Sequence, residues 1–155
     1  MSTASNARSR PRHRPVRRAA LADLVGRQVA ALNRQDLDGL MTLYAPDAVL
    51  EFPASPVVPG REAIRAAFAR FFADWEEEIT LSQLLFGAQG VAAEGTVRGR
   101  HRTLHLKIPG RTAVPQRTYE HPFAAFLEVR RGLIRRHRVY YDARDLVRQL
   151  LGGGR

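Results

Sequence analysis

Apolar residues in the N-terminal half of the chain recur at spacings of three and four, the period of an amphipathic helix. A first stripe of this kind lies within residues 21–32 and ends at a polar run. A second, shorter stripe covers residues 37–44 and is followed by the turn signal Pro46-Asp47. A third, rich in aromatic residues, runs over residues 61–75. The pattern therefore predicts three helices in this half.

The hydrophobic period changes to two after residue 78, which is typical of β-strands. Strands are expected at residues 48–52, 79–86, 91–106, 119–129 and 133–141. A last, short helix is expected over residues 144–151. Helices that precede most of the strands predict an α+β fold. The helices must cover one face of a curved antiparallel sheet, and such a sheet leaves a concave mouth where ligands bind.

Positive charge is concentrated at the N-terminus of this basic chain. The net charge is +10, and six arginines precede the first acidic residue, Asp23. Residues 1–18 combine these arginines with Ser and Pro and hold few apolar side chains, so we expect a disordered tail. The tail is either a solvated leader or an electrostatic contact for nucleic acid or anionic lipid. Residues 19–151 are then expected to form a single domain, and residues 152–155 a flexible end.

The composition excludes several kinds of site. The chain has no cysteine, which rules out disulfides, zinc–thiolate sites and cysteine nucleophiles. No apolar run is long enough for a membrane span, and none follows the basic N-terminus as in a secretory signal. We therefore expect a cytoplasmic protein without a membrane span. The histidines and carboxylates show no spacing typical of metal ligands, so we expect neither a metal nor a cofactor.

Several segments of the chain resemble a known family. They are residues 29–33, 36–40, 43–49 and 60–65 near the start, and 132–134, 140–142 and 149–150 near the end. Together they resemble bacterial ketosteroid isomerases and SnoaL-like proteins of the nuclear transport factor 2-like superfamily. The resemblance implies a cone-shaped, curved antiparallel sheet packed on three N-terminal helices. This fold carries isomerases, cyclases, dehydratases, epoxide hydrolases and non-catalytic binders, so the resemblance leaves the activity open.

The catalytic residues of the ketosteroid isomerases are missing at the matching positions. Their Asp base follows a strand acid and precedes a proline, and here Phe52 stands at that place, between Glu51 and Pro53. Their oxyanion tyrosine follows an arginine on the first helix, where this chain has Gln28. Their second donor, an Asp on a late strand, falls near Ala124. Steroid isomerisation needs a base and neutral donors around the oxyanion, so we do not expect it here.

Alternate side chains on a strand point to opposite faces of the sheet. The apolar phase of the late strands is expected to face the cavity, and it carries His101, His121, His137 and Tyr141. Histidine titrates near neutral pH and serves as an acid or a base. His121 and His137 are therefore candidate catalytic residues, with Tyr141 as a hydrogen-bond donor. Each histidine alone has the alternative of a hydrogen-bonded structural role.

Asp142 is the candidate carboxylate. In SnoaL-like cyclases an acid at the end of the final strand is the proposed acid/base, and residues 140–142 look like that motif. Because Asp142 also precedes the last predicted helix, a helix cap is the alternative. The expected substrate-binding residues, for which core packing is the alternative, are Tyr44, Phe52, Phe68, Phe72, Trp75, His101, Phe123 and Val139.

The leading hypothesis is a SnoaL-like enzyme that acts on a bulky, largely apolar compound by cofactor-free acid/base chemistry. The reaction would be of the isomerase, cyclase, dehydratase or epoxide-hydrolase type. The alternative is a non-catalytic, homodimeric ligand-binding or scaffold module. A homodimer is expected in either case, because the fold leaves one sheet face uncovered, and Pro122, Ala124 and Phe126 lie on that face among arginines.

Overall fold

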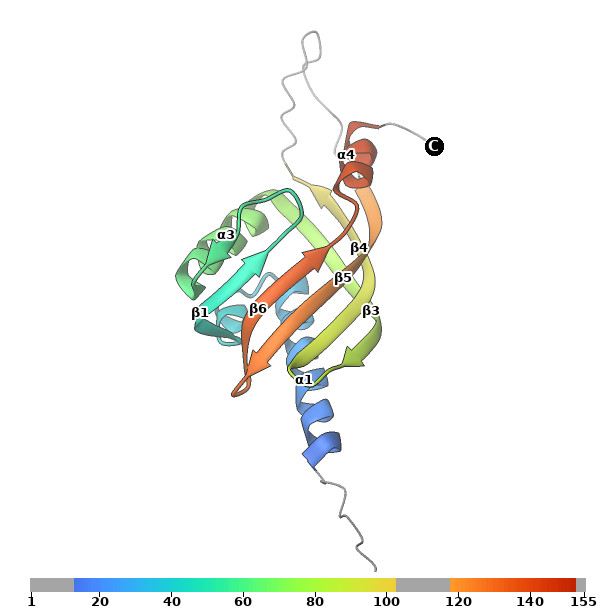
Figure 1. Cartoon of the computed structure of the whole chain (residues 1–155). Coiled ribbons are helices and arrows are strands. Elements are labelled where there is room, and N and C mark those ends of the chain that lie inside the picture. Colours follow the sequence, from blue (N-terminus) through green and yellow to red (C-terminus); the bar gives the residue numbers. More distant parts are fainter. Residues whose placement is uncertain (1–12, 103–117, 153–155) are drawn as a thin grey trace, which may run out of the picture.

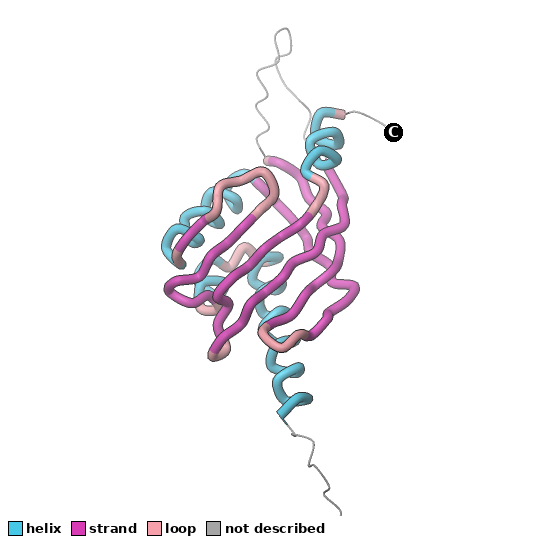
Figure 2. Tube along the Cα trace, viewed as in Figure 1, coloured by secondary structure: helices cyan, strands magenta, loops and turns pink. Residues whose placement is uncertain are grey.

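The computed structural model of the chain describes residues 13–102 and 118–152 (Figure 1). Its elements are α1 (His13–Asn33), α2 (Leu37–Met41), β1 (Tyr44–Glu51), β2 (Val58–Pro59), α3 (Arg61–Asp74), β3 (Trp75–Phe86), β4 (Gly90–His101), β5 (Thr118–Arg130), β6 (Leu133–Tyr140) and α4 (Ala143–Leu151). The described strands form a six-stranded sheet in the order β2-β1-β6-β5-β4-β3. The first three helices lie on one face of this curved sheet (Figures 1 and 2). The predicted α+β class is confirmed.

The sheet is antiparallel at every strand pair but one. The strands β1 and β6 run parallel, and their register places Leu50 beside His137. These two strands lie far apart in the sequence, so no hairpin imposes an antiparallel direction on them. The predicted curved antiparallel sheet is therefore confirmed, and this one parallel pair joins its early strand to the late strands.

Helix α1 begins earlier than predicted. Residues 13–18, expected to belong to a disordered tail, form its N-terminal part. Arg and Ala are strong helix formers, and Pro15 falls in the first turn, where a helix tolerates proline. Residues 1–12 lie outside the described residues, and so does most of the predicted contact with nucleic acid or lipid. The end of the chain, residues 153–155, lies outside them as well.

Helix α2 is shorter than predicted, because Tyr44 belongs to β1 and not to a helix. The Asp36 side chain caps α2 by accepting a hydrogen bond from the Gly39 backbone N–H at 2.9 Å. Soon after the helix, the Leu43 carbonyl accepts a hydrogen bond from the Ile134 N–H at 2.8 Å, which ties the chain to β6. The strand predicted over residues 48–52 therefore starts at Tyr44.

The third helix ends at Asp74, and β3 begins at Trp75, four residues before the predicted strand. Along β3, Trp75, Glu77 and Ile79 are half-buried, whereas Glu76 and Glu78 are exposed. The period of two thus already holds across the three glutamates. The predicted strand 91–106 is β4 up to His101, and residues 103–106 lie outside the described residues.

Two amide side chains anchor the edge strand β3 to the end of α1. The Asn33 side chain exchanges two hydrogen bonds with the Ile79 backbone, at 2.8 and 3.0 Å. The Gln35 side chain donates to the Trp75 carbonyl at 2.8 Å. These bonds hold α1 across the concave face of the sheet, and α1 therefore presents Gln28 to the interior.

The main core lies between the first three helices and the sheet, and residues such as Leu40, Leu50, Ile64 and Ile134 are completely buried there. A smaller core under α4 joins Leu150 to the sheet. None of the described helices combines the length and the apolar character that crossing a membrane requires.

Candidate active site

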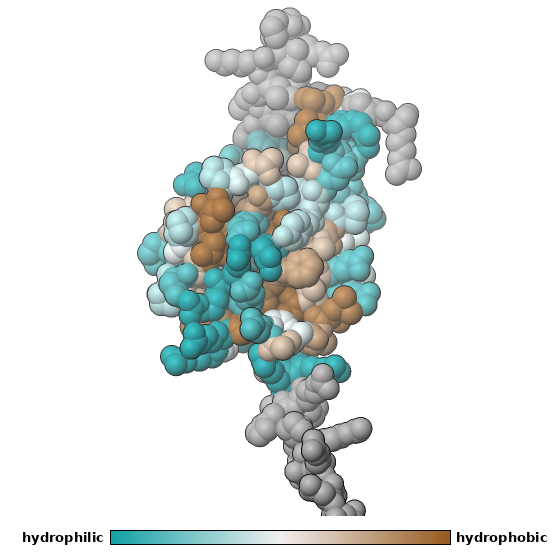
Figure 3. Space-filling model, in the orientation of Figure 1, coloured by the Kyte–Doolittle hydropathy of each residue, from teal (hydrophilic) through white to brown (hydrophobic). Residues whose placement is uncertain are grey.

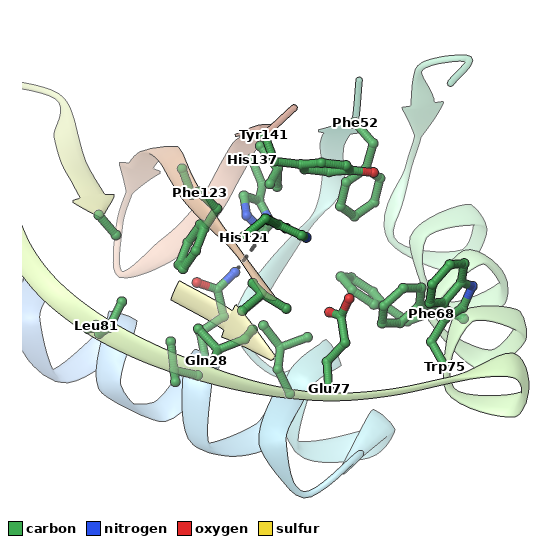
Figure 4. Close-up of a pocket in the computed structure, with 18 of the residues that line it drawn as sticks. Gln28, Phe52, Phe68, Trp75, Glu77, Leu81, His121, Phe123, His137 and Tyr141 are labelled. Carbon is green, nitrogen blue, oxygen red and sulfur yellow. Dashed lines mark hydrogen bonds between the residues drawn. The ribbon is translucent and has the colours of Figure 1, made fainter. Parts of the chain in front are cut away.

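A cavity of about 250 Å³ opens between the helices α1 and α3 and the concave face of the sheet. Most of its wall is apolar, with aliphatic side chains from α1 and the sheet and aromatic rings from α3. Figure 4 shows Phe68 and Trp75 at one end, Leu81 and Phe123 at the other, and polar side chains between them. The cavity thus offers an apolar enclosure with a small set of polar groups near its middle, as ligand sites commonly do.

Eight of the residues expected at the site line this cavity: His121, His137, Tyr141, Phe52, Phe68, Trp75, Phe123 and Val139. The sheet residues among them lie on the strand phase that the alternation predicts to face inward. The alternation of side chains along each strand therefore predicts most of these sheet residues, even though it does not say which strands are neighbours.

Four expected residues lie elsewhere. Asp142 caps α4, because its side chain accepts hydrogen bonds from the backbone N–H groups of Arg144 and Asp145 at 2.9 and 3.0 Å. His101 packs edge-on against Trp75, with ring centroids 4.5 Å apart. Phe72 faces the core, and its helical neighbour Phe71 lines the cavity instead. Tyr44 is completely buried behind the wall.

Tyr44, Gln28 and His137 form a hydrogen-bonded triad. The Gln28 amide nitrogen donates to the Tyr44 hydroxyl at 3.0 Å, and that hydroxyl lies 2.7 Å from His137 Nδ1. The Gln28 nitrogen also lies 3.3 Å from the same Nδ1. The amide nitrogen of Gln28 can only donate, which makes Nδ1 the acceptor of this contact. Burial raises the pKa of Tyr44, so its hydroxyl keeps the proton that it can donate to the same Nδ1.

His137 is therefore held as a hydrogen-bond donor toward the cavity. Burial lowers its pKa to about 4, so the ring is neutral at neutral pH. With Nδ1 accepting hydrogen bonds, the single ring proton resides on Nε2. Since His137 lines the cavity, its Nε2–H is the group that it offers to a ligand.

His121 has the opposite arrangement. Its Nδ1 lies 3.1 Å from the Pro122 carbonyl oxygen, which can only accept, so Nδ1 carries the proton. In the neutral ring, Nε2 then holds a free lone pair. The rings of Tyr119 and Tyr141 both stack on the His121 ring, with centroids 5.7 and 4.9 Å away. The two phenol rings thus keep the imidazole of His121, a potential base, in one orientation.

Glu77 supplies the carboxylate of the cavity. It lies on β3 and points into the cavity, as Figure 4 shows. Desolvation raises its pKa to about 6, and a hydrogen bond donated by Tyr119 offsets part of this effect. Burial and the nearby Glu77 carboxylate together raise the pKa of Tyr141, which stays a neutral donor. A carboxyl group that titrates near neutral pH is suited to proton transfer.

Gly99 makes the contact between Tyr119 and Glu77 possible. The pairings Glu77 with Gly99 and Gly99 with Tyr119 place the three residues in one row across β3, β4 and β5. A Cβ atom at Gly99 would lie 2.5 Å from the Tyr119 hydroxyl oxygen. The missing side chain therefore lets the phenol cross β4 and reach the carboxylate on β3.

The family model described as the SnoaL-like domain matches residues 25–137. The chain belongs to the SnoaL-like family. The matched region contains Gln28, Glu77, His121 and His137, whereas Tyr141 and the helix α4 follow it.

Solved structures with the same architecture agree with this SnoaL-like assignment. A protein of Xanthomonas campestris pv. campestris, proposed to be a polyketide cyclase, is 27% identical with a TM-score of 0.75, covering 86% of this chain and 98% of that one. Another proposed polyketide cyclase, of Pseudomonas putida, is 26% identical with a TM-score of 0.72, covering 84% and 96%. An LEH-like epoxide hydrolase of M. tuberculosis shares the fold at 20% identity, with a TM-score of 0.63 over 86% and 90% of the two chains. A comparison with curated protein sequences found no match.

Two polar residues that line the cavity, Glu77 and Gln28, were not predicted as site residues from the sequence. Glu77 stands in a run of three glutamates, which looks like a solvated turn, and the phase shared with Trp75 and Ile79 was the signal that could have found it. For Gln28, the sequence indicates only that it stands at the position of the isomerase tyrosine, and it predicts no role for its side chain. No three His, Asp or Glu side chains within residues 13–102 and 118–152 are grouped to hold a metal ion.

Proposed function

We propose that this SnoaL-like protein is an acid–base enzyme that moves a proton on a small, largely apolar carbonyl compound without a cofactor. One observation carries the proposal: His121 and His137 line the same cavity with opposite proton arrangements. The first presents a lone pair and the second presents an N–H group. A base and a fixed neutral donor are the two parts that proton abstraction next to a carbonyl requires.

In this mechanism His121 Nε2 takes a proton from the carbon next to the carbonyl group. The electron pair of that C–H bond moves toward the carbonyl, and the oxygen gains negative charge. His137 Nε2–H donates a hydrogen bond to that oxygen, and Tyr44 and Gln28 keep the donor in place. In an enone, His121 returns the proton to a different carbon of the conjugated dienolate, which gives an isomer. In a compound with a second carbonyl, the enolate carbon attacks that carbonyl and closes a ring, and the new alkoxide takes the proton from His121.

The size of the cavity narrows the substrate. About 250 Å³ lies just below the range of about 300–1,000 Å³ that is usual for sites of drug-sized ligands. A compound with one or two rings suits this volume better than the bulky compound expected from the sequence. The names of the cyclase relatives support a carbonyl substrate, because polyketides carry such groups.

Hydrogen exchange in D2O tests the proposal without knowledge of the product. The protein is incubated with a panel of small cyclic ketones and enones, and deuterium uptake beside the carbonyl is followed by NMR. We expect uptake that depends on the protein, that His121→Gln abolishes, and that His137→Phe reduces by about 10²–10³-fold, the usual effect of losing one oxyanion donor. Protein-dependent uptake that survives His121→Gln would contradict the assignment of the base.

A ligand-binding module without catalysis is the second candidate, and Phe52 favours it. This ring lines the cavity at the position where the isomerases carry their base, and Asp142 is a helix cap. Thermal-shift measurements on the same panel separate the two functions. Ligands that raise the melting temperature but exchange no deuterium would identify a binding module.

A further inference from the structure

The cavity holds one acidic group and no permanent cation. Among the described residues that line it, Glu77 is the sole acid, and neither Lys nor Arg contributes to the wall. The whole chain nevertheless carries 25 Lys and Arg residues. An anionic ligand would find no fixed positive charge here, whereas a cationic ligand would meet a carboxylate.

Aromatic rings surround this carboxylate. Trp75 and Glu77 are two positions apart on β3, so their side chains lie next to each other on the same face. Phe71 stacks on Trp75 with ring centroids 6.0 Å apart and an angle of 11° between the rings, and both rings line the cavity. Figure 4 shows Glu77 pointing into the middle of the cavity, beside the end that holds Phe68 and Trp75. The faces of aromatic rings attract cations, and Trp attracts them most strongly.

The charge of the Glu77 carboxylate is incompletely compensated by the protein. Tyr119, Tyr141 and His121 are the titratable groups that face it from β5 and the end of β6, and the two phenols are neutral. A desolvated carboxylate with a single neutral donor is costly, which is why burial outweighs the Tyr119 hydrogen bond in its pKa. A cation in the cavity would offset this cost.

We propose that the ligand of this cavity carries a positively charged nitrogen, which lies between the Glu77 carboxylate and the aromatic end of the cavity formed by Phe68, Phe71 and Trp75. This inference narrows the substrate class of the proposed enzyme to cationic compounds. It rests on the proposed function only for the carbonyl group of the substrate. The carbonyl group of such a substrate would lie toward His121 and His137. The rest of the ligand is small and apolar, as the aliphatic wall requires.

The fluorescence of Trp75 reports binding in the cavity, because Trp75 lines the cavity and is the single tryptophan of the chain. Its fluorescence is titrated with two probes of equal shape, benzyltrimethylammonium and its uncharged carbon analogue neopentylbenzene. At pH 8 we expect the ammonium probe to bind at least about tenfold more tightly, which corresponds to about 1.4 kcal/mol. Glu77→Gln should reduce this preference to near unity.

Glu78→Gln is the matched control, since Glu78 is the adjacent, exposed residue on the other face of β3. It should leave the preference unchanged. A second measurement needs no variant: lowering the pH from 8 to 5 protonates Glu77 in the wild-type protein and should remove the preference. The pH titration tests whether the preference depends on the Glu77 charge, even where the Glu77→Gln variant fails to fold.

Equal affinity for the two probes at pH 8, no binding of the ammonium probe, or a preference that survives both Glu77→Gln and pH 5 would overturn the inference. The result is independent of the proposed reaction. Ammonium binding without deuterium exchange on any carbonyl compound would leave the cationic site and contradict the enzyme. Deuterium exchange on neutral ketones, without tighter binding of the ammonium probe, would support the enzyme and contradict the cationic site.

Discussion

At the scale of single residues, burial affects Glu77 and His137 by the same physical cause and shifts their pKa values in opposite directions. Desolvation disfavours the charged form of each group, so it raises the pKa of the carboxyl to about 6 and lowers that of the imidazole to about 4. Both groups are therefore held close to neutrality by the apolar wall. The imidazole of His137 therefore remains a neutral donor over the whole physiological pH range. The carboxyl group of Glu77, with a pKa of about 6, changes its charge close to that range.

Replacing Glu77 by Gln should stabilise the protein at high pH. The folded-state pKa of about 6 lies above the ordinary value of 4.5, so the folded state binds this proton more tightly than the unfolded state does. Stability from this group is present at low pH and is lost as the pH rises from about 4.5 through 6. Glu77→Gln should therefore raise the free energy of unfolding at pH 8 by about 2 kcal/mol at most.

Urea unfolding of both proteins at pH 8 and pH 4 checks this prediction. The difference should vanish at pH 4, where Glu77 is protonated in both states. A variant that is less stable than the wild type at pH 8 would show that the ionised carboxylate stabilises the fold, against our description of the cavity.

At the scale of elements, the row Glu77–Gly99–Tyr119 shows how three strands build one acid group. Gly99→Ala places a methyl group against the Tyr119 hydroxyl and should push the phenol away from the carboxylate. We expect a loss of about 1–3 kcal/mol in the free energy of unfolding, as for other overpacked sites. The pKa of Glu77 should rise above 6, because its hydrogen bond is lost, and this is measurable by 13C NMR of the carboxyl group.

Gly26→Ala is the matched control, because a Cβ atom at this position of α1 meets no atom within 4 Å. It should stabilise the helix by about 1 kcal/mol or less and leave the Glu77 titration unchanged. A Gly99→Ala variant with wild-type titration of Glu77 would show that the glycine has no part in positioning Tyr119.

Helix α4 gives a test of the role of Asp142. Because its side chain caps the helix and does not line the cavity, Asp142→Ala should cost about 1 kcal/mol of stability through the lost cap. Ligand binding and deuterium exchange should stay at wild-type levels when measured well below the melting temperature. Asp142→Asn, which keeps a capping side chain, should recover most of the stability. A loss of exchange in both variants at full stability would restore Asp142 as a catalytic residue.

At the scale of the whole molecule, the uncovered face of the sheet carries an outer aromatic cluster of Phe126, Arg138 and Tyr140. The two rings pack edge-on with centroids 5.8 Å apart, and the Arg138 guanidinium lies 5.8 Å from the centre of the Phe126 ring. Arg138 Nε is buried without a hydrogen-bond partner among the described residues. Figure 3 shows apolar residues among charged ones over this face.

We propose that a second copy of the chain covers this cluster, as expected from the fold. Sedimentation equilibrium should give a dimer for the wild-type protein and a monomer for Phe126→Glu. The matched control is Val57→Glu, since Val57 is exposed just before the edge strand β2, which β1 and β6 separate from the Phe126 strand β5. A monomeric wild-type protein at micromolar concentration would contradict the proposal.

The fold could be predicted from the sequence because its apolar residues follow one period in the helices and another in the strands. The site could be predicted in part, because alternation alone places His121, His137 and Tyr141 on the inward face. The inward position of Glu77 follows from its strand phase, but its contact with Tyr119 and the contact of Tyr44 with His137 could not be predicted, because both depend on pairing between distant segments. Tyr44 reaches His137 through the parallel contact of β1 and β6, and Tyr119 reaches Glu77 across the gap left by Gly99.

The opposite proton arrangement of His121 and His137 is the central claim, and 15N NMR of the imidazole rings measures it directly. Spectra of 15N-histidine-labelled protein at pH 7 are assigned with His121→Gln and His137→Gln. We predict a neutral His137 with its proton on Nε2 and a His121 whose neutral form carries its proton on Nδ1. The same tautomer in both rings, or a protonated His137 at this pH, would contradict the account.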